Sequence, residues 1–368
     1  MKIDRGLFLT LCGLTIFGLV MMSSISISSS FEVTGANDFY FWRHFWHIII
    51  GIPLFFFGLK FPVQNLRRLS VLIFVISVVL IILTIVIGQH YGTAARLWLK
   101  LGPLSFQPVE LAKLATIIFL AALFSSGKNN PTTLQGGFLP FTVVLGIPPI
   151  LLAIQSVFGS LLVLMLTAAA VYFTAGANLR HFAGGIGVFL FGATIITLTT
   201  PYILHRVKVF LNPNLDPLNT GFQVKQALIA IGSGGMFGRG FQNSIQKFDY
   251  LPEVQSDTIF SAIAEEMGFF RILILVGAYL FIAYKGFFIA KNASDSFSKL
   301  LAVGITTWIA GQAFINIGVN LALLPNTGIT LPLISYGGTS LLATLLSFGI
   351  LLQISSQIQH KKHRKHYF

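Results

Sequence analysis

The stretch L-P-E-V-Q-S-D-T-I-F-S-A-I-A-E-E-M-G, residues 251–268, decides how this chain is organised. It places Asp257 directly before an apolar helical run, whereas most of the chain on either side is apolar enough to lie in lipid. We therefore expect a carboxylate held at a membrane boundary, and we expect any chemistry to lie in the surrounding polar interval 206–268. That interval holds six of the eleven acidic residues: Asp216, Asp249, Glu253, Asp257, Glu265 and Glu266.

The composition excludes a soluble globular protein with a charged surface. Of the 368 residues, 55% are hydrophobic and only 10% are charged. A helix needs about 20 apolar residues to cross a hydrocarbon core of roughly 30 Å, because lipid offers no partner for an unpaired N–H or C=O group. The alternation expected of a membrane β-barrel is absent. We predict an all-α polytopic membrane protein that forms a single membrane domain over residues 1–368.

Ten apolar segments predict ten transmembrane helices, with one long loop at 201–267 between the seventh and eighth. An even number of crossings puts both termini on one side of the membrane. That side would carry fourteen Lys and Arg residues in its short loops and tails, against three on the other, so both termini are expected in the cytoplasm and the long loop outside. The segments lie near 7–27, 46–60, 69–88, 108–126, 138–155, 157–175, 182–200, 268–290, 299–324 and 335–357.

The net charge of +13 does not indicate nucleic-acid binding, because the basic residues lie in short loops and tails that orient a membrane protein. The basic tail at 358–368 predicts a cytoplasmic contact with anionic membrane lipid. The bacterial cytoplasmic membrane is the location that we expect.

The first candidate site is A-R-L-W-L-K-L-G-P-L-S-F-Q-P-V-E-L-A-K, residues 95–113. Pro108 suits the first turn of a helix, which would bring Glu110 and Lys113 onto one face, three residues apart. Ionisable groups at membrane depth are costly and usually mark a site, although a structural ion pair between helices is the alternative. Trp98 is either a site residue or an interfacial anchor, and Arg96 would meet a phosphate or a lipid headgroup.

The long loop offers a second candidate site. Its basic residues suit a polyanionic ligand, and a solvated surface is the alternative. Its glycine-rich stretch at 232–240 has neither the P-loop spacing nor a preceding strand, so tight turns explain it better than a nucleotide site. The basic residues are Arg206, Lys208, Lys225, Arg239 and Lys247.

Asp257 is the candidate general base. If residues 256–268 are helical, Ser261 and Glu265 partly share its face. A carboxylate beside an apolar helix has a raised pKa, which suits proton abstraction near neutral pH. Capping of the following helix is the alternative role.

The uncharged run at 324–340 is rich in Pro and Gly, which predicts irregular backbone that packs against protein or closes a pocket at membrane depth. No cysteine cluster or H-E-x-x-H helix predicts a metal site. A divalent cation remains a possible contributor that the sequence does not specify.

These motifs resemble the SEDS family (shape, elongation, division and sporulation), the polytopic peptidoglycan polymerases that include RodA and FtsW. The resemblance rests on Q-P-V-E-L-A-K at 107–113, on the stretch 208–268 and on L-P-L-I-S-Y-G-G-T-S at 331–340. S-I-Q-K before Tyr250 is closer to the division branch, FtsW. The chain departs from the family pattern at Val157, where an acidic residue is usual, and at Leu97, where arginine is usual.

The resemblance implies a glycosyltransferase that polymerises lipid II into β-1,4 glycan strands with inversion, and a class B penicillin-binding protein as transpeptidase partner. Asp257 matches the family's essential loop aspartate, while Trp98, Glu110 and Lys113 match its functional positions. The expected substrate-binding set is Lys113, Glu110, Trp98, Arg96, Arg206, Lys208 and Arg239. A lipid II flippase, with Glu110 and Lys113 as gating charges, and a noncatalytic scaffold are the alternatives.

Overall fold

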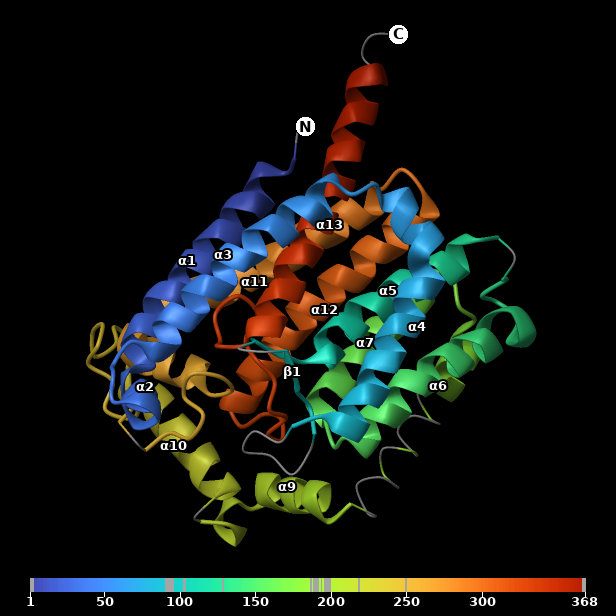
Figure 1. Cartoon of the computed structure of the whole chain (residues 1–368). Helices are drawn as coiled ribbons and strands as arrows, with labels where there is room; N and C mark the ends of the chain where they lie inside the picture. Colours follow the sequence, from blue (N-terminus) through green and yellow to red (C-terminus); the bar gives the residue numbers. More distant parts are fainter. Residues whose placement is uncertain are drawn as a thin grey trace.

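Helices form most of the chain in the computed structural model, and the long ones run side by side in one bundle (Figure 1). The structure describes residues 3–89, 96–101, 104–127, 129–185, 187, 192, 194, 200–217, 219–248 and 250–365. The prediction of an all-α polytopic membrane protein is confirmed.

Eight of the described helices are long and apolar enough to cross a membrane, and α7 (Phe158–Thr174) is a shorter apolar helix. The seventh predicted segment, 182–200, lies largely outside the described residues. The other nine predicted segments each coincide with a helix. The eight long ones are α1 (Arg5–Ile25), α3 (Phe39–Lys60), α4 (Val63–Ile87), α5 (Pro108–Ser125), α6 (Leu139–Ile154, preceded by the π-helical turn η1, Leu134–Phe138), α11 (Ile259–Lys291), α12 (Ser296–Asn320) and α13 (Gly338–Lys365).

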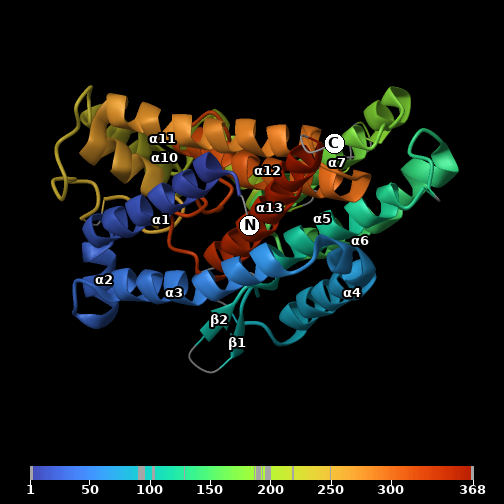
Figure 2. The ribbon, with the colours of Figure 1, turned by 90° about the horizontal axis from the view of Figure 1, so that it is seen from above.

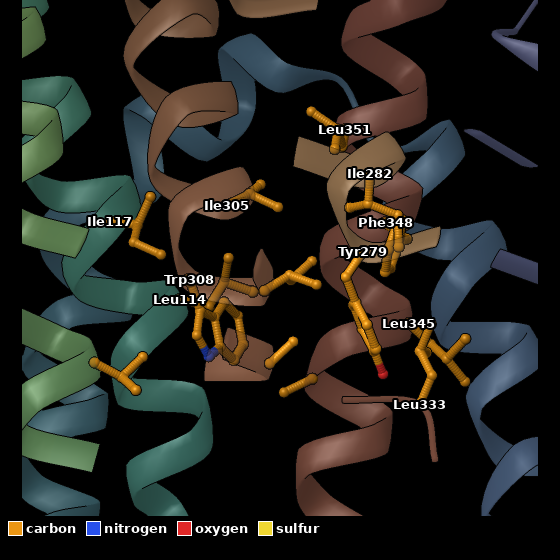
Figure 3. Packing of buried hydrophobic residues seen from close by; sticks show 14 of the residues in the cluster. Leu114, Ile117, Tyr279, Ile282, Ile305, Trp308, Leu333, Leu345, Phe348 and Leu351 are labelled. Atoms are coloured by element: carbon orange, nitrogen blue, oxygen red, sulfur yellow. The ribbon is translucent and has the colours of Figure 1, made fainter. Parts of the chain in front are cut away.

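Helices α12 and α13 form the centre of the bundle. The most apolar stretch of each is 83% buried, against 28% for α3, α4 and α11, which present their outer faces to lipid. Figure 2 shows α13 between α3 on one side and α11 and α12 on the other. Trp308 of α12 is fully buried, and Figure 3 shows it close to Leu114 of α5. The most buried helices are therefore the ones that can hold polar groups away from lipid.

The start of α1 and the end of α13 lie at the same end of the bundle (Figure 1). The short elements α2 (Ile27–Thr34), α9 (Pro201–Leu211) and α10 (Thr220–Ser233) lie at the opposite end. This arrangement agrees with an even number of crossings. The short 3-10 turn η2 (Pro213–Leu215) joins α9 to α10.

A two-stranded antiparallel hairpin precedes α5, and the sequence analysis did not predict it. Strand β1 (Leu99–Leu101) pairs with β2 (Leu104–Phe106), with Lys100 opposite Ser105. The main-chain N–H of Gln107, which follows the hairpin, donates a 3.0 Å hydrogen bond to Oγ1 of Thr339 at the start of α13. The hairpin is thus attached to the central helix.

A kink at Gly268 divides α11 into a short buried segment and a membrane-spanning one. Gly268 has φ of 74°, and a side chain there would collide with the main chain of Phe237 and Gly238. The N–H of Arg239 donates to the carbonyl of Glu265 at 2.9 Å, so the glycine-rich turn lies directly against the kink. Glycine is needed here because its missing Cβ permits both the positive φ and the close contact.

Candidate active site

Asp257 lies in the turn just before α11, not within the helix. The helix begins at Ile259, and its N-cap residue, Thr258, makes no capping hydrogen bond through its side chain. The predicted shared face is therefore wrong, because residue 257 lacks helical geometry. Ser261 instead donates a 2.7 Å hydrogen bond to Oδ1 of Asn320, and Glu265 is buried among other partners.

The surroundings of Asp257 raise the pKa of its carboxyl to about 7. Burial contributes most, and the negative charge of Glu253 adds to it. The positive charge of Arg206 and a hydrogen bond from Ser256 act in the opposite direction. The side chain is nevertheless only partly buried, so it keeps access to a ligand. A carboxyl with this pKa exchanges protons near neutral pH, as a general base must.

The main chain around Asp257 is held by side chains from other elements. The amides of Asn316 and Asn320, both on α12, each donate a 3.0 Å hydrogen bond to the carbonyl of Asp257. The hydroxyl of Ser335 donates to the carbonyl of Ser256 at 2.6 Å. The N–H of Tyr336 donates to the carbonyl of Gln255 at 2.8 Å. The position of the turn is thus fixed by α12 and by the irregular segment that precedes α13.

That irregular segment, 321–337, packs against protein as the sequence predicted. Ile329, Leu331, Leu333 and Ile334 are all buried, although no helix or strand forms there. The hydroxyl of Tyr279 on α11 donates a 2.6 Å hydrogen bond to the carbonyl of Pro332. Irregular backbone inside a membrane bundle needs such partners, because lipid provides none.

The predicted pair of Glu110 and Lys113 is confirmed. Oε1 of Glu110 lies 2.9 Å from Nζ of Lys113 on the first turns of α5, and both side chains are almost completely buried. Nζ of Lys113 also donates a 2.8 Å hydrogen bond to Oε1 of Gln312 on α12 and lies over the ring of Trp308. Oε2 of Glu110 has no hydrogen-bond partner among the described residues. This unpaired acceptor is itself buried.

Gln312 connects this ion pair to the irregular segment. Its Nε2 donates to the carbonyl and the hydroxyl of Thr330, at 3.1 and 3.2 Å. The hydroxyl of Thr330 in turn lies 3.1 Å from that of Ser340 on α13. Gln312 and Asn316 are one helical turn apart, so their attachment points on α12 are separated by about 6 Å along its axis. The ion pair and the main chain of Asp257 are thus both held by amide side chains of α12, through Gln312 and Asn316 respectively.

The sequence analysis missed Gln312, Asn316 and Asn320. Their spacing of four residues places three amides on one face of a mostly apolar helix, and this was the signal that could have identified them. Buried amides in a membrane helix are costly unless they are hydrogen-bonded.

Trp98 and Arg96 lie in the segment that leads into the hairpin. The carbonyl of Trp98 accepts a 2.9 Å hydrogen bond from the N–H of Gln89. The guanidinium of Arg96 donates to the carbonyl of Val86, near the end of α4, and its own carbonyl accepts from Gln155. Arg96 is exposed and Trp98 is partly exposed, so both side chains remain accessible.

Arg206 and Lys208 both lie on α9, and the charge of Arg206 reaches Asp257. Nη1 of Arg206 donates a 2.8 Å hydrogen bond to the carbonyl of Asn326, two residues before Gly328. Lys208 is exposed. The positive charge of Arg206 lowers the pKa of Asp257 and so opposes the larger effect of burial. Helix α9 therefore brings positive charge to the carboxylate.

Two other basic residues of the loop have acidic partners inside the protein. Arg239 lies 3.4 Å from Glu265, and Lys247 lies 3.0 Å from Glu266. Lys247 is fully buried and also donates to Ser24 on α1, so its prediction as part of a polyanion-binding surface is wrong. Arg239 keeps a partly exposed side chain.

An apolar cavity of about 250 Å³ lies between α3, α4, α5 and α13. Leu111, Leu114 and Ala115 of α5 line it, on either side of Lys113 in the sequence. Among the described residues, no group of three or more His, Cys, Asp or Glu side chains is placed to hold a metal ion. The cavity thus offers apolar space beside the helix that carries the ion pair.

The bundle and this site together define a polytopic α-helical membrane protein with a partly buried carboxyl group, of raised pKa, at one end. Residues 4–360 match the family described as "Cell cycle protein", which groups FtsW, RodA and SpoVE. The chain belongs to this family, and the resemblance to SEDS proteins is confirmed.

Curated relatives carry the name "Probable peptidoglycan glycosyltransferase FtsW". The relative from Idiomarina loihiensis is 35% identical over 96% of this chain and 87% of its own length. The relative from Francisella salina is 37% identical over 96% of this chain and 89% of its own.

Solved structures share the fold. One, described as "Structural coordination of polymerization and crosslinking by a peptidoglycan synthase complex", has a TM-score of 0.81 and 27% identity over 97% of this chain and 99% of the other. The rod shape determining protein RodA of Thermus thermophilus has a TM-score of 0.72 and 26% identity, over 97% and 98% of the two chains.

Proposed function

We propose that this chain is a peptidoglycan glycosyltransferase of the FtsW type, which polymerises lipid II outside the bacterial cytoplasmic membrane with Asp257 as general base. The names of its relatives support the activity, since the similarity to these relatives extends over nearly the whole chain. The observation that carries the residue assignment is Asp257 itself: it is partly buried, has a pKa of about 7 and is held by two amides through its own carbonyl.

In the proposed reaction, Asp257 takes the proton from the 4-hydroxyl of the acceptor N-acetylglucosamine. The oxygen then attacks the anomeric carbon of the donor N-acetylmuramic acid, and the bond from that carbon to the pyrophosphate oxygen breaks. The electron pair leaves with the undecaprenyl pyrophosphate. One displacement on an α-linked donor inverts the anomeric centre and forms the β-1,4 bond, without a covalent enzyme intermediate.

Positive charge on α9 would stabilise the leaving pyrophosphate. Arg206 already acts on Asp257, and Lys208 is exposed two residues later on the same helix. Fixed positive groups near a developing negative charge lower the barrier most when they are held in place beforehand. Arg239, Arg96 and Trp98 remain proposed substrate contacts. A divalent cation would enter with the pyrophosphate, as a counter-ion of the substrate.

Lys113 and Glu110 would bind a polar part of the substrate. Their own charges compensate each other, so the pair can be buried without an isolated charge. The buried and unpaired Oε2 of Glu110 would accept a hydrogen bond from a substrate hydroxyl or amide that reaches the pair. The cavity beside α5 would accommodate part of the lipid tail, because its lining is almost entirely apolar.

The proposed partner is a class B penicillin-binding protein, which would cross-link the strands. The relative in the solved complex is described as acting in a synthase that coordinates polymerisation with cross-linking. We propose that both termini are cytoplasmic, which puts Asp257 on the outer side. The basic tail at 358–368, most of which forms the last turns of α13, would then contact anionic lipid.

Reconstitution into liposomes with fluorescent lipid II tests this function against the flippase. A polymerase converts the lipid into strands that are retained on a gel. Translocation of lipid II across the bilayer without strands, with the transpeptidase partner present, would contradict the proposal. The absence of both strands and translocation would favour the noncatalytic scaffold.

A further inference from the structure

Three amides form a continuous polar ladder along α12. Gln312, Asn316 and Asn320 are each at most 2% exposed, in a helix that is otherwise mostly apolar. Nδ2 of Asn316 donates to the carbonyls of Asp257 and Ile329, at 3.0 and 2.7 Å. Nδ2 of Asn320 donates to the carbonyl of Asp257 at 3.0 Å. Two buried amides thus converge on one carbonyl, which belongs to the residue that carries the carboxylate.

The second bond of Asn316 reaches the other side of the carboxylate. Ile329 follows Gly328, and a Cβ built on Gly328 would lie 3.4 Å from Oδ2 of Asp257. Asn316 is therefore hydrogen-bonded both to the main chain of Asp257 and to the main chain of Ile329, which directly follows Gly328. A shift of this one amide would alter the distance between the carboxylate and the segment that faces it.

Asn320 lacks this double role. Its remaining contacts are to its own helix and to α11: it donates to the carbonyl of Asn316 at 2.9 Å and accepts from Ser261. Loss of Asn320 would leave both bonds of Asn316 in place. The contacts therefore indicate that Asn316 contributes more than Asn320 to the position of Asp257.

We propose that Asn316 is a positioning residue for Asp257, with Asn320 as its secondary support. The inference rests on the proposed function, since it assumes that Asp257 is the base. Asn316 does not touch the substrate in this account. It holds the Asp257 carbonyl, which fixes the direction from which the carboxylate approaches the acceptor hydroxyl.

The physical basis is the geometric sensitivity of proton transfer. Displacement of a catalytic group by about 1 Å can cost about 100-fold in rate. Without the amide of Asn316, the turn at 255–258 can relax outward. Because burial is the largest cause of the raised pKa of Asp257, outward movement would also bring its pKa closer to the ordinary value.

The test compares strand synthesis by Asn316→Ala, Asn316→Asp and Asn320→Ala with the unsubstituted chain, across pH 5 to 9 and with the proteins quantified after purification. Asn316→Asp keeps the volume but cannot donate to the two carbonyls. Thr306→Val on α12 is the matched control, because the hydroxyl of Thr306 is buried and, within the described part of the chain, bonds only to the carbonyl of Ala302 in its own helix.

We expect kcat to fall about 30-fold in both Asn316 variants, with KM changed less than about twofold, and about fivefold in Asn320→Ala. The acid limb of the pH profile should move to lower pH in Asn316→Ala and stay in place in Thr306→Val. A variant that only lost folded protein would lower kcat without moving the limb. Thermal unfolding measures that loss separately.

In an Asp257→Asn background, Asn316→Ala should cause no further loss, because the group that it positions is gone. Unchanged kcat and an unchanged acid limb in Asn316→Ala and Asn320→Ala would overturn the positioning role while Asp257→Asn stays inactive. An active Asp257→Asn would overturn the general base itself, and with it this inference.

Discussion

The carboxylate of Asp257 lies directly beside Gly328: a Cβ built on Gly328 would be 3.4 Å from Oδ2 of Asp257. Gly328 is exposed and has φ of 66°, in the left-handed region that glycine adopts without strain. The two residues come from segments about 70 positions apart in the sequence, which α12 holds together through Asn316. The open side of the carboxylate is therefore bordered by backbone that has no side chain.

Gly328→Ala should lower activity more than the same substitution at a glycine of positive φ outside the site. The strain costs about 1 kcal/mol at such a position, and here the methyl group would also contact the carboxylate. Gly127→Ala is the matched control, since Gly127 has φ of 73° and no atom within 4 Å of a Cβ. We expect similar losses of thermal stability in both variants and about a tenfold loss of strand synthesis only in Gly328→Ala. Equal activities would show that the border of the site tolerates a side chain.

The pH dependence of synthesis should report the charges around Asp257. A general base must be deprotonated, so kcat/KM should fall on the acid side with a midpoint near pH 7. Glu253→Gln removes a charge that raises the pKa and should move this midpoint to lower pH. Arg206→Gln removes a charge that lowers the pKa and should move it to higher pH. Shifts in the same direction for both variants would contradict the assignment.

A control for this series is Glu32→Gln on α2, which removes the same charge from a residue that does not contribute to the raised pKa of Asp257. Its pH midpoint should match that of the unsubstituted chain. Any shift common to Glu32→Gln and Glu253→Gln would reflect total charge and not the local effect of Glu253.

The ion pair on α5 predicts a strongly non-additive pair of substitutions. Lys113→Met leaves the carboxylate of Glu110 buried without its partner, which should cost about 3–5 kcal/mol in unfolding free energy. The double variant Glu110→Gln with Lys113→Met should recover much of that stability, because no charge remains buried. Thermal unfolding in detergent measures this coupling. Activity should stay low in the double variant if the pair binds substrate; full activity would assign the pair a purely structural role.

Asp257→Asn should make the protein more stable at alkaline pH. The pKa of Asp257 is about 7 in the folded chain against an ordinary 3.8, so the folded state disfavours its charge. The free energy of unfolding of the parent chain therefore falls as pH rises from about 4 to about 7 and stays lower above it. Asparagine carries no charge, so the variant's advantage should be present at pH 8 and vanish near pH 4. Thermal midpoints across this range provide the measurement, and a less stable variant at pH 8 would contradict it.

The sequence predicted what depends on local spacing. Pro108 starts α5, and the separation of three residues within that helix pairs Glu110 with Lys113. Apolar length likewise located the long helices. Their hydropathy is independent of tertiary contacts, so it can be read directly from the chain.

The sequence could not predict partners that only the fold brings together. Lys247 was grouped with Arg206 because both are basic residues of one loop, yet Lys247 is buried against Glu266 and Ser24. The contact of Gln312 with Lys113 joins residues 199 positions apart. Nor could apolar periodicity reveal the end of the turn at Asp257, because helix boundaries depend on tertiary hydrogen bonds such as the one from Asn316.

The most direct test of the central claim is glycan-strand synthesis from purified lipid II by the unsubstituted chain and by Asp257→Asn, each alone and with the transpeptidase partner. Asparagine preserves the volume of the side chain but cannot take the proton. We predict strands from the unsubstituted chain and at least about a 1,000-fold lower rate from a folded Asp257→Asn protein. Equal strand synthesis by the two proteins would contradict the account and place the base elsewhere.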